Sequence, residues 1–279
     1  MNKDNYITIN ELFLRTENRT IMKIYAPFFL KDVAQGISKI GNSGVLNLIL
    51  SNRLTDRWMS EVTYGLSLFR QAILDFETSN EVLADKSKSG IPFFRENLNL
   101  LVGPEMHIYG LRLYETYASC LNENPDLILT LDYDKLAEHC IFENMFLLKC
   151  KYDEAQNLNY FKKQLEKEYD KFFYDEEYTG FAPDSRFFSL LCTACLEMRA
   201  PQFAEKKEWM LASLVMPDDA IYHYQDGSLQ SYSSTAIPFD IVEQISMPEY
   251  EKRKDEYTAI AGLLKQKGIQ PEGLLEGFE

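Results

Sequence analysis

Two cysteines three positions apart form the first pair of side chains whose spacing could do chemistry. Cys192 and Cys195 make a Cys-x-x-Cys motif, which redox pairs and zinc knuckles use to hold two thiolates close together. The motif lies within the apolar segment 187–196, no second Cys-x-x-Cys accompanies it, and no βα turn precedes it. We therefore expect two buried core cysteines on an apolar helix face.

The histidines and the acidic runs give weaker signals for a catalytic or metal centre. His107, His139 and His223 lie far apart, and no pair has the spacing that places two imidazoles on one helical face. Acidic runs at 175–177 and 218–219 could hold a divalent cation, because hard cations take clustered oxygen ligands. A chain with 43 acidic residues has such neighbours by chance, so we expect solvated loops and assign no metal site.

Loop motifs of common enzyme classes are missing from the sequence. No GxGxxG, Walker or GxSxG pattern occurs, so nucleotide folds and serine hydrolases that are identified by those loops lose their main support. The five cysteines stand in apolar surroundings, which is typical of reduced thiols and predicts no disulfide: Cys120, Cys140, Cys150, Cys192 and Cys195.

Composition restricts the partners. The 43 acidic residues outnumber the 29 basic ones and give a formal charge of −14. Phosphate backbones and anionic lipids are bound by clustered Lys and Arg, so this acidic chain is expected to bind neither nucleic acid nor a membrane surface. No stretch approaches the roughly 20 apolar residues of a membrane span, and the first residues form no apolar signal core. The sequence predicts a cytoplasmic protein without a cofactor.

Strands that could position these residues are short segments rich in β-branched and aromatic side chains. They are predicted over 20–25, where Pro27 stops the strand, and over 45–50, 126–132 and 209–216. The segment 126–132 is expected to be buried on both faces. The pair Asp-Gly at 226–227 predicts a hairpin between 221–224 and 229–232.

Helices are predicted over 30–39, 60–78 and 251–267, and after the capping residues Asp153 and Asp184. The polar segment 79–90 is expected to be a mobile surface loop. Helices and strands mix without strict alternation, which predicts a single α+β domain over 1–279, with a mixed, largely antiparallel sheet and helices packed around it.

Motifs over about 20–240 resemble those of a bacterial family known as domain of unknown function 2971. The segment 199–211 (Arg-Ala-Pro-Gln-Phe-Ala-Glu-Lys-Lys-Glu-Trp-Met-Leu) is similar to the family's late motif, which has Lys, Pro, Phe and Glu-x-Glu-Trp-Arg before a strand. Tyr25 resembles its opening tyrosine strand, and 54–56 (Leu-Thr-Asp), Glu61 and 64–65 (Tyr-Gly) resemble its Leu-Asn-Asp, Glu and Tyr-Gly sequence.

Two further segments fall in the same order. The segment 117–121 (Tyr-Ala-Ser-Cys-Leu) is similar to the family's Ser-Phe-Ser strand, and 147–154 resembles a strand that ends in Tyr-Asp-Glu before a helix. Residues 241–279 are then expected to be a C-terminal helical extension. The resemblance implies candidate binding residues at Asp56, Glu61 and Trp209, and we expect Trp209 to be largely buried because its strand is apolar on both faces.

The chain also departs from the family pattern. The family's Asn is Thr55 here, two extra residues separate Asp56 from Glu61, and the late motif has Lys206 and Met210 where the family has Glu and Arg. The family's central Trp and Tyr have no counterpart between 122 and 126. These losses favour a divergent member that acts as a non-catalytic binding or regulatory module, in bacterial stress or phage defence, with a basic protein as partner.

The alternative is an NAD-consuming enzyme of the ADP-ribosyltransferase type, on analogy alone. Its residues would be Tyr25 on the opening strand, Ser119 on a middle strand and Glu208 beside a late strand. The tyrosine would stack on nicotinamide and the serine would position the ribose. The glutamate would hydrogen-bond the ribose hydroxyl and stabilise an oxocarbenium-like transition state. NAD would then be the cofactor.

Overall fold

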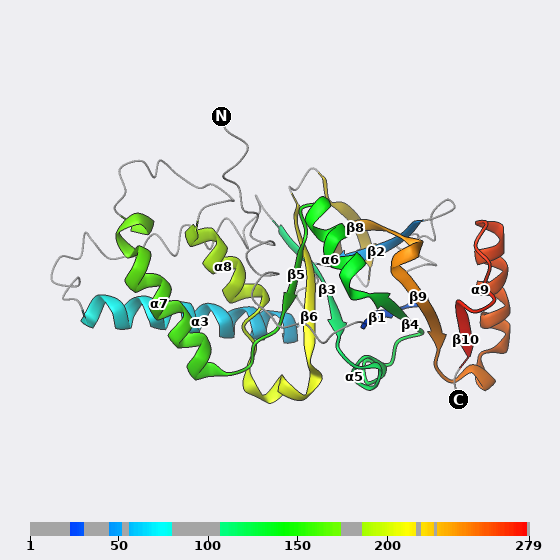
Figure 1. Cartoon of the computed structure of the whole chain (residues 1–279), viewed down its shortest axis with the longest axis horizontal. Helices are drawn as coiled ribbons and strands as arrows, with labels where there is room; N and C mark the ends of the chain where they lie inside the picture. The colour runs from blue at the N-terminus through cyan, green and yellow to red at the C-terminus, as the bar shows by residue number, and fades with distance from the viewer. Residues whose placement is uncertain are drawn as a thin grey trace.

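The computed structural model of the protein describes residues 23–30, 45–51, 56–79, 107–173, 186–215, 219–225 and 228–277. Within these ranges, a ten-stranded sheet forms the centre of the protein (Figure 1). The strands are β1 (Lys23–Phe28), β2 (Val45–Ser51), β3 (His107–Tyr114), β4 (Leu127–Asp132), β5 (Phe146–Lys149), β6 (Glu208–Val215), β7 (Ile221–Gln225), β8 (Ser228–Pro238), β9 (Val242–Met247) and β10 (Leu275–Gly277). The helices are α3 (Asp56–Ser79), α5 (Tyr117–Leu121), α6 (Tyr133–Phe142), α7 (Glu154–Phe173), α8 (Arg186–Leu196) and α9 (Lys254–Gln266), and the short 3-10 turns are η4 (Pro201–Lys206), η6 (Phe239–Ile241) and η7 (Tyr250–Lys252).

The sheet branches at β3. One edge of β3 pairs with β6 over its whole length, and β6 in turn pairs with β5. The opposite edge meets β2 at Gly110 and β1 at Tyr114. From there one branch continues through β4, β9 and β10, and the other through β8 and β7. Only β9 and β10 pair in parallel among the described strands, so the predicted α+β fold with a mixed, largely antiparallel sheet is confirmed.

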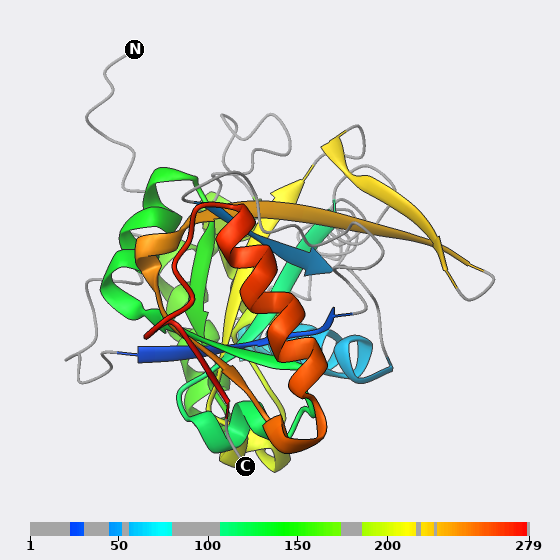
Figure 2. The ribbon, with the colours of Figure 1, turned by 90° about the vertical axis from the view of Figure 1, so that its right-hand side faces the viewer.

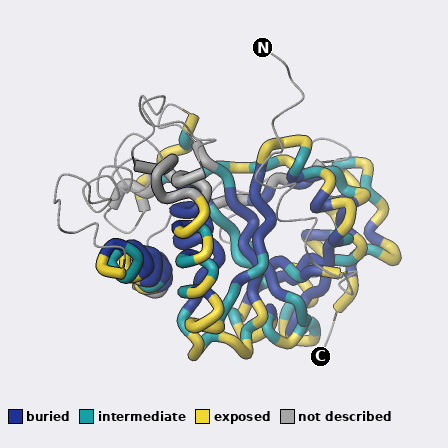
Figure 3. The backbone as a smooth tube through the Cα atoms, turned by 60° about the vertical axis from the view of Figure 1, so that its left-hand side comes forward, coloured by how far each residue is buried: buried dark blue, intermediate teal, exposed yellow. Residues whose placement is uncertain are grey.

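Side-chain alternation along the strands builds two cores on opposite faces of the sheet. Trp209 and Leu211 of β6 belong to a core that α6 and α9 complete, and Met210 and Ala212 belong to a core that α3, α7 and α8 complete. Figure 3 shows buried backbone through the central strands, whereas buried and exposed positions alternate along α7 and α9. A third, small cluster under α5 contains Tyr114.

Most predicted elements are present. Strands β2, β4 and β6 and the hairpin of β7 and β8 lie where the sequence predicts them, and β4 is buried over five consecutive residues. Helices α3, α7, α8 and α9 are also confirmed. The N–H of Gln156 donates to Asp153 at 3.0 Å, and Gly268 has the positive φ expected after a helix end. Several predictions lie outside the described residues. They are the predicted helix over 31–39, the surface loop over 80–90, the acidic run at 175–177, the capping residue Asp184 and the acidic residue at 218.

Two local predictions are wrong. β1 does not stop before Pro27 but continues through it to Phe28. Among the described strands, β3 pairs with β1 at Tyr25 alone, so on that side of β1 no described strand pairs with Pro27, and proline is tolerated at such a position. Segment 117–121 is helix α5 and not a strand, since the Thr116 hydroxyl accepts the N–H of Ser119 and caps the helix. After residue 241, β9 and β10 join the sheet beside α9.

Candidate functional site

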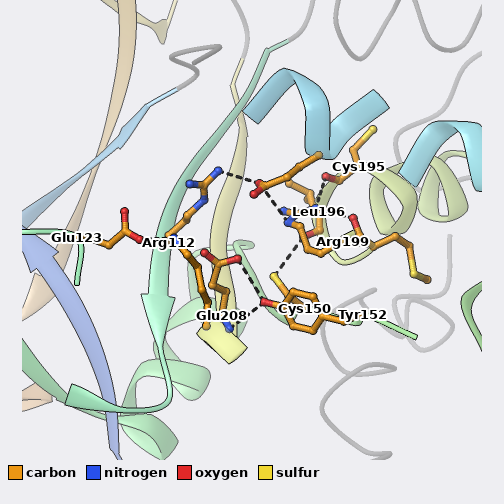
Figure 4. Close-up of polar contacts among 11 residues, drawn as sticks. Arg112, Glu123, Cys150, Tyr152, Cys195, Leu196, Arg199 and Glu208 are labelled. Carbon is orange, nitrogen blue, oxygen red and sulfur yellow. Dashed lines mark hydrogen bonds and ion pairs between the residues drawn. The ribbon is translucent and has the colours of Figure 1, made fainter. Parts of the chain in front are cut away.

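A group of polar side chains gathers where α3 and the segment after α8 meet β3, β6 and the segment after β5. Its members are Glu61 of α3, Arg112 of β3, Tyr152 after β5, Arg199 after α8 and Glu208 of β6, which we call the buried ionic cluster although Arg112 and Tyr152 are only partly buried. Figure 4 shows Arg112, Tyr152, Arg199 and Glu208 turned toward one another from separate elements. Glu61 and Glu208 are each only 1% exposed, and Arg199 is fully buried.

Glu61 joins two arginines. Its Oε2 lies 2.8 Å from Nη2 of Arg112 and 3.4 Å from Nε of Arg199. Glu61 reaches this position because α3 presents an otherwise apolar face to the sheet, with Val62, Phe69 and other residues in the same core. A buried carboxylate of this kind is stable only when cations accompany it, and the two arginines provide them.

Arg199 also closes the end of α8. Its Nη1 donates to the carbonyl oxygens of Cys195 at 3.0 Å and Met198 at 2.9 Å. A cation here satisfies carbonyls that the helix end leaves open and interacts favourably with the helix dipole. The backbone N–H of Arg199 donates to the carbonyl of Lys151, and Lys151 forms an ion pair with Glu197. The end of α8 is therefore fastened to the strand extension that follows β5.

Glu208 and Tyr152 are bonded twice. The Tyr152 hydroxyl donates to Oε2 of Glu208 at 3.2 Å and accepts the backbone N–H of Glu208 at 3.1 Å. The carbonyl of Glu208 accepts the N–H of Cys150 at 3.0 Å. Burial in the first place, and then the neighbouring Cys150 and Glu208, raises the pKa of Tyr152 far above its usual value. The phenol therefore stays protonated and keeps donating to the Glu208 carboxylate.

Two of the three candidate catalytic residues lie in one row on the same face of the sheet. Tyr25 pairs with Tyr114 across β1 and β3, and Tyr114 pairs with Glu208 across β3 and β6. Two strand spacings separate Tyr25 from Glu208, which is about 10 Å. The Tyr114 side chain occupies the position between them and is 1% exposed.

Ser119, the third candidate, does not lie on a strand. It belongs to α5, which packs beside β1 and β3. Its hydroxyl accepts a hydrogen bond from Oγ1 of Thr116 at 2.8 Å, and its backbone N–H donates to the same atom at 3.1 Å. The predicted serine strand is thus replaced by a helix cap, and Ser119 contributes to that cap.

Trp209 lies on the face of the sheet opposite to Glu208, because neighbouring strand residues point to opposite sides. Its indole N–H donates to Oε1 of Glu115 at 3.0 Å. Its ring packs edge-on against the ring of Tyr133, with 5.1 Å between the two ring centroids. The predicted burial of Trp209 is confirmed at 4% exposure. Asp56 is the first residue of α3, and the structure does not describe its side chain.

Gly65 marks the closest approach of α3 to α8. A Cβ at this position would lie 1.8 Å from the carbonyl oxygen of Ala194, which no real atom pair permits. On the same helix, the Tyr64 hydroxyl donates to Oε2 of Glu154 at 3.1 Å. Burial and then Glu154 raise the pKa of Tyr64 to about 12. The Tyr-Gly pair singled out in the sequence therefore serves helix packing.

The thiols are buried. All five cysteines are free, and burial raises the pKa of Cys140, Cys150 and Cys195 to about 12. The prediction of two buried core cysteines at Cys192 and Cys195 is confirmed, at 2% and 0% exposure. Within the described ranges, no three His, Cys, Asp or Glu side chains gather in a way that could hold a metal ion.

Sequence reasoning missed Arg112 and the role of Tyr152. Arg112 lies on β3, which the sequence pattern did not predict, and Tyr152 was known only as part of the Tyr-Asp-Glu segment before α7. A lone glutamate on the apolar face of α3 was the available signal, since a buried carboxylate requires a cation from another element.

No protein-family model, curated protein or solved structure matches this chain. Among the described helices, none combines the length and the apolar character needed to cross a membrane.

Proposed function

We propose that this protein is a non-catalytic binding or regulatory module. The observation that carries the proposal is that the acidic residues of the candidate site bind internal partners. Glu208 is bonded by Tyr152, and Glu61 is bonded by Arg112 and Arg199. A catalytic carboxylate has to reach the reacting atoms of a substrate, whereas these two are 1% exposed.

The geometry supports a structural role for the buried ionic cluster. Glu61 and Arg199 connect α3 to the end of α8, Arg112 connects α3 to β3, and Tyr152 connects the segment after β5 to β6. Each contact thus joins two elements that are distant in sequence. Such buried polar contacts fix one arrangement of elements, because any other arrangement leaves a charge without a partner.

The residues at which the chain departs from the resembled family support the same proposal. Met210 is buried in the core with α3 and α8, where an arginine would carry a charge into apolar surroundings. Lys206 lies on η4 and pairs with Glu123 at 2.7 Å. We propose that the protein is a divergent member of the domain of unknown function 2971 family in which the catalytic or ligand-binding polar set has been lost.

The proposed partner is a basic protein. A formal charge of −14 attracts a positively charged surface and repels nucleic acid. From the family resemblance we further propose a role in bacterial stress or phage defence.

The second candidate is the NAD-consuming transferase, favoured by the row of Tyr25, Tyr114 and Glu208 on one sheet face. In that proposal the two outer residues of the row would contact nicotinamide and ribose. Ser119 would act from α5.

Two assays separate the candidates. Purified protein is incubated with NAD at millimolar concentration and free nicotinamide is measured, with Glu208→Gln as the matched variant. The module predicts no release above buffer, whereas release that Glu208→Gln abolishes would establish the transferase. In parallel, affinity purification from native lysate at low salt should retain a basic partner in stoichiometric amount, and high salt should release it because screening weakens charge attraction. A lysate without such a partner contradicts the module.

A further inference from the structure

The end of α6 carries an exposed aromatic side chain between two carboxylates. Phe142, the last residue of the helix, is 85% exposed, more than any other large apolar side chain in the described ranges. Glu138 lies one helical turn before Phe142 on the same side of the helix, and Glu143 follows as the C-cap. We call these three residues the α6 end. A single exposed apolar residue is common on protein surfaces, so the argument for a partner depends on the charges around Phe142.

The two carboxylates have no internal counterion. Glu138 and Glu143 are exposed, and neither forms an ion pair or a side-chain hydrogen bond with any residue that the structure describes. The basic residues of α6 bind elsewhere. Nζ of Lys135 donates to a carbonyl of η6 at 2.8 Å, and a ring nitrogen of His139 lies 3.0 Å from a carbonyl oxygen of β8. The α6 end thus differs from the buried ionic cluster, whose carboxylates bind partners within the protein.

Glu143 also stands at the negative end of the helix dipole. The last carbonyl groups of a helix give this end a partial negative charge, which a cation stabilises and a carboxylate opposes. Lysine and arginine are favoured near helix C-termini for this reason. A carboxylate that lowers the stability of its own helix, without a described cation to compensate, is typical of a position that serves binding.

We propose that the α6 end binds an arginine-bearing segment of the basic partner. A guanidinium group stacks on an aromatic face and pairs with carboxylates through its parallel N–H groups, so one arginine over the ring of Phe142 could use both kinds of contact. Lysine is a compact point charge and lacks the planar fork. The inference rests on the proposed function, because it gives the proposed basic partner a place on the surface.

Fluorescence anisotropy with a short labelled peptide of alternating arginine and alanine tests this surface, with the full chain at low salt. Wild type should bind the arginine peptide more tightly than a lysine peptide of the same length. Phe142→Ala should weaken binding of the arginine peptide by about two- to fivefold. The double variant Glu138→Gln with Glu143→Gln should weaken it by about fivefold, because two surface ion pairs are lost.

Matched variants separate the α6 end from the general acidity of the chain. Glu166→Gln with Asp255→Asn removes the same two negative charges from exposed positions on α7 and α9, and should leave binding within about twofold of wild type. Tyr224→Ala should leave it unchanged. Tyr224 is 75% exposed on the hairpin of β7 and β8, which projects from the body of the protein (Figure 2). Circular dichroism establishes that each variant folds.

The helix dipole gives a second test that needs no ligand. Glu143→Gln removes a negative charge from the negative end of α6 and should raise the melting midpoint by about 1–3 °C. Glu166→Gln, in the middle of α7, should not raise it. A lower midpoint for Glu143→Gln would overturn the argument that this carboxylate opposes its own helix.

The outcomes distinguish this inference from the proposed function. Equal weakening by the two double variants, no effect of Phe142→Ala, or a lysine peptide that binds as tightly as the arginine peptide would overturn the α6 end as the arginine site. The proposed function would still stand if wild type retained a basic partner from lysate. If wild type bound neither peptide and retained no such partner, both proposals would fail.

Discussion

Glu61 is the residue at which the ion pairs of the candidate site converge. It serves Arg112 and Arg199 at once, so a neutral residue in its place leaves two guanidinium groups without their anion in a buried environment. The same carboxylate was a candidate binding residue from the sequence. Its type and its helix could be predicted, but its two partners could not, since they come from segments 51 and 138 residues away along the chain.

We expect Glu61→Gln to lower the free energy of unfolding by about 3–5 kcal/mol, the loss that follows when a buried ion pair is broken on one side. Urea unfolding measures it. The control is Asp75→Asn on the same helix, where the pair with Lys162 is about one-third exposed and worth at most about 1 kcal/mol. Equal losses in both variants would mean that the buried ionic cluster does not hold α3 in place.

Glu208 and Tyr152 should be coupled in a double-mutant cycle. Tyr152→Phe and Glu208→Gln each remove one side of a partly buried hydrogen bond to a charged group, and we expect a coupling energy of about 1.5–3 kcal/mol from urea unfolding. The matched pair is Tyr64→Phe with Glu154→Gln, which removes an exposed bond of the same kind and should give about 0.5 kcal/mol or less. A coupling below that of the control would contradict the role given to Tyr152.

The buried thiols predict a loss of stability in alkali. Burial raises the pKa of Cys140 from 9.0 to about 12, so above pH 9 the unfolded chain gives up a proton that the folded chain retains. The contribution of the Cys140 thiol to the free energy of unfolding is fully present below pH 9. It declines by about 1.4 kcal/mol per pH unit as the pH rises toward 12. We compare Cys140→Ala with wild type by urea unfolding at pH 8, 9 and 10. The amount by which the variant's free energy of unfolding falls below that of wild type should therefore shrink as the pH rises. A pH-independent difference would contradict this.

At the scale of elements, helices and strands with a strong apolar periodicity could be predicted from the sequence. Strands that depend on pairing with distant segments could not. The apolar repeat of α3 and the buried run of β4 need no knowledge of their neighbours. β3 and β9 are missing from the sequence-based prediction because Gly110 and Arg112, or Glu243 and Gln244, interrupt their apolar pattern. Both strands exist because neighbours on each side pair with them. In α5 the Thr116 cap outweighs the strand-like composition.

The crossing of α3 and α8 predicts opposite effects for two glycines. Gly65→Ala places a Cβ against the Ala194 carbonyl and should destabilise the protein by at least about 1–3 kcal/mol through overpacking. Gly262→Ala in α9 meets no atom within 4 Å and should stabilise the helix by up to about 1 kcal/mol. Thermal melting of both variants checks the pair. A tolerated Gly65→Ala would mean that α3 and α8 do not approach so closely.

For the whole molecule, the branched sheet explains why the predicted residues form no single open site. Tyr25 and Glu208 share a face, Trp209 lies on the other face, and Ser119 belongs to a helix cap. Residue types and their order along the chain could be predicted. Which face each residue occupies depends on strand register, and a shift of one residue moves every side chain to the opposite face.

The central claim is that Glu208 and its neighbours hold the fold together and do not bind NAD. Thermal melting with NAD at millimolar concentration, with ATP and buffer as controls, tests it most directly, because a ligand of the native state raises the melting midpoint even without turnover. We predict the same midpoint in all three conditions, and a lower midpoint for Glu208→Gln with and without NAD. A rise that is specific to NAD, and that Glu208→Gln and Tyr25→Ala abolish, would contradict the account and establish the transferase.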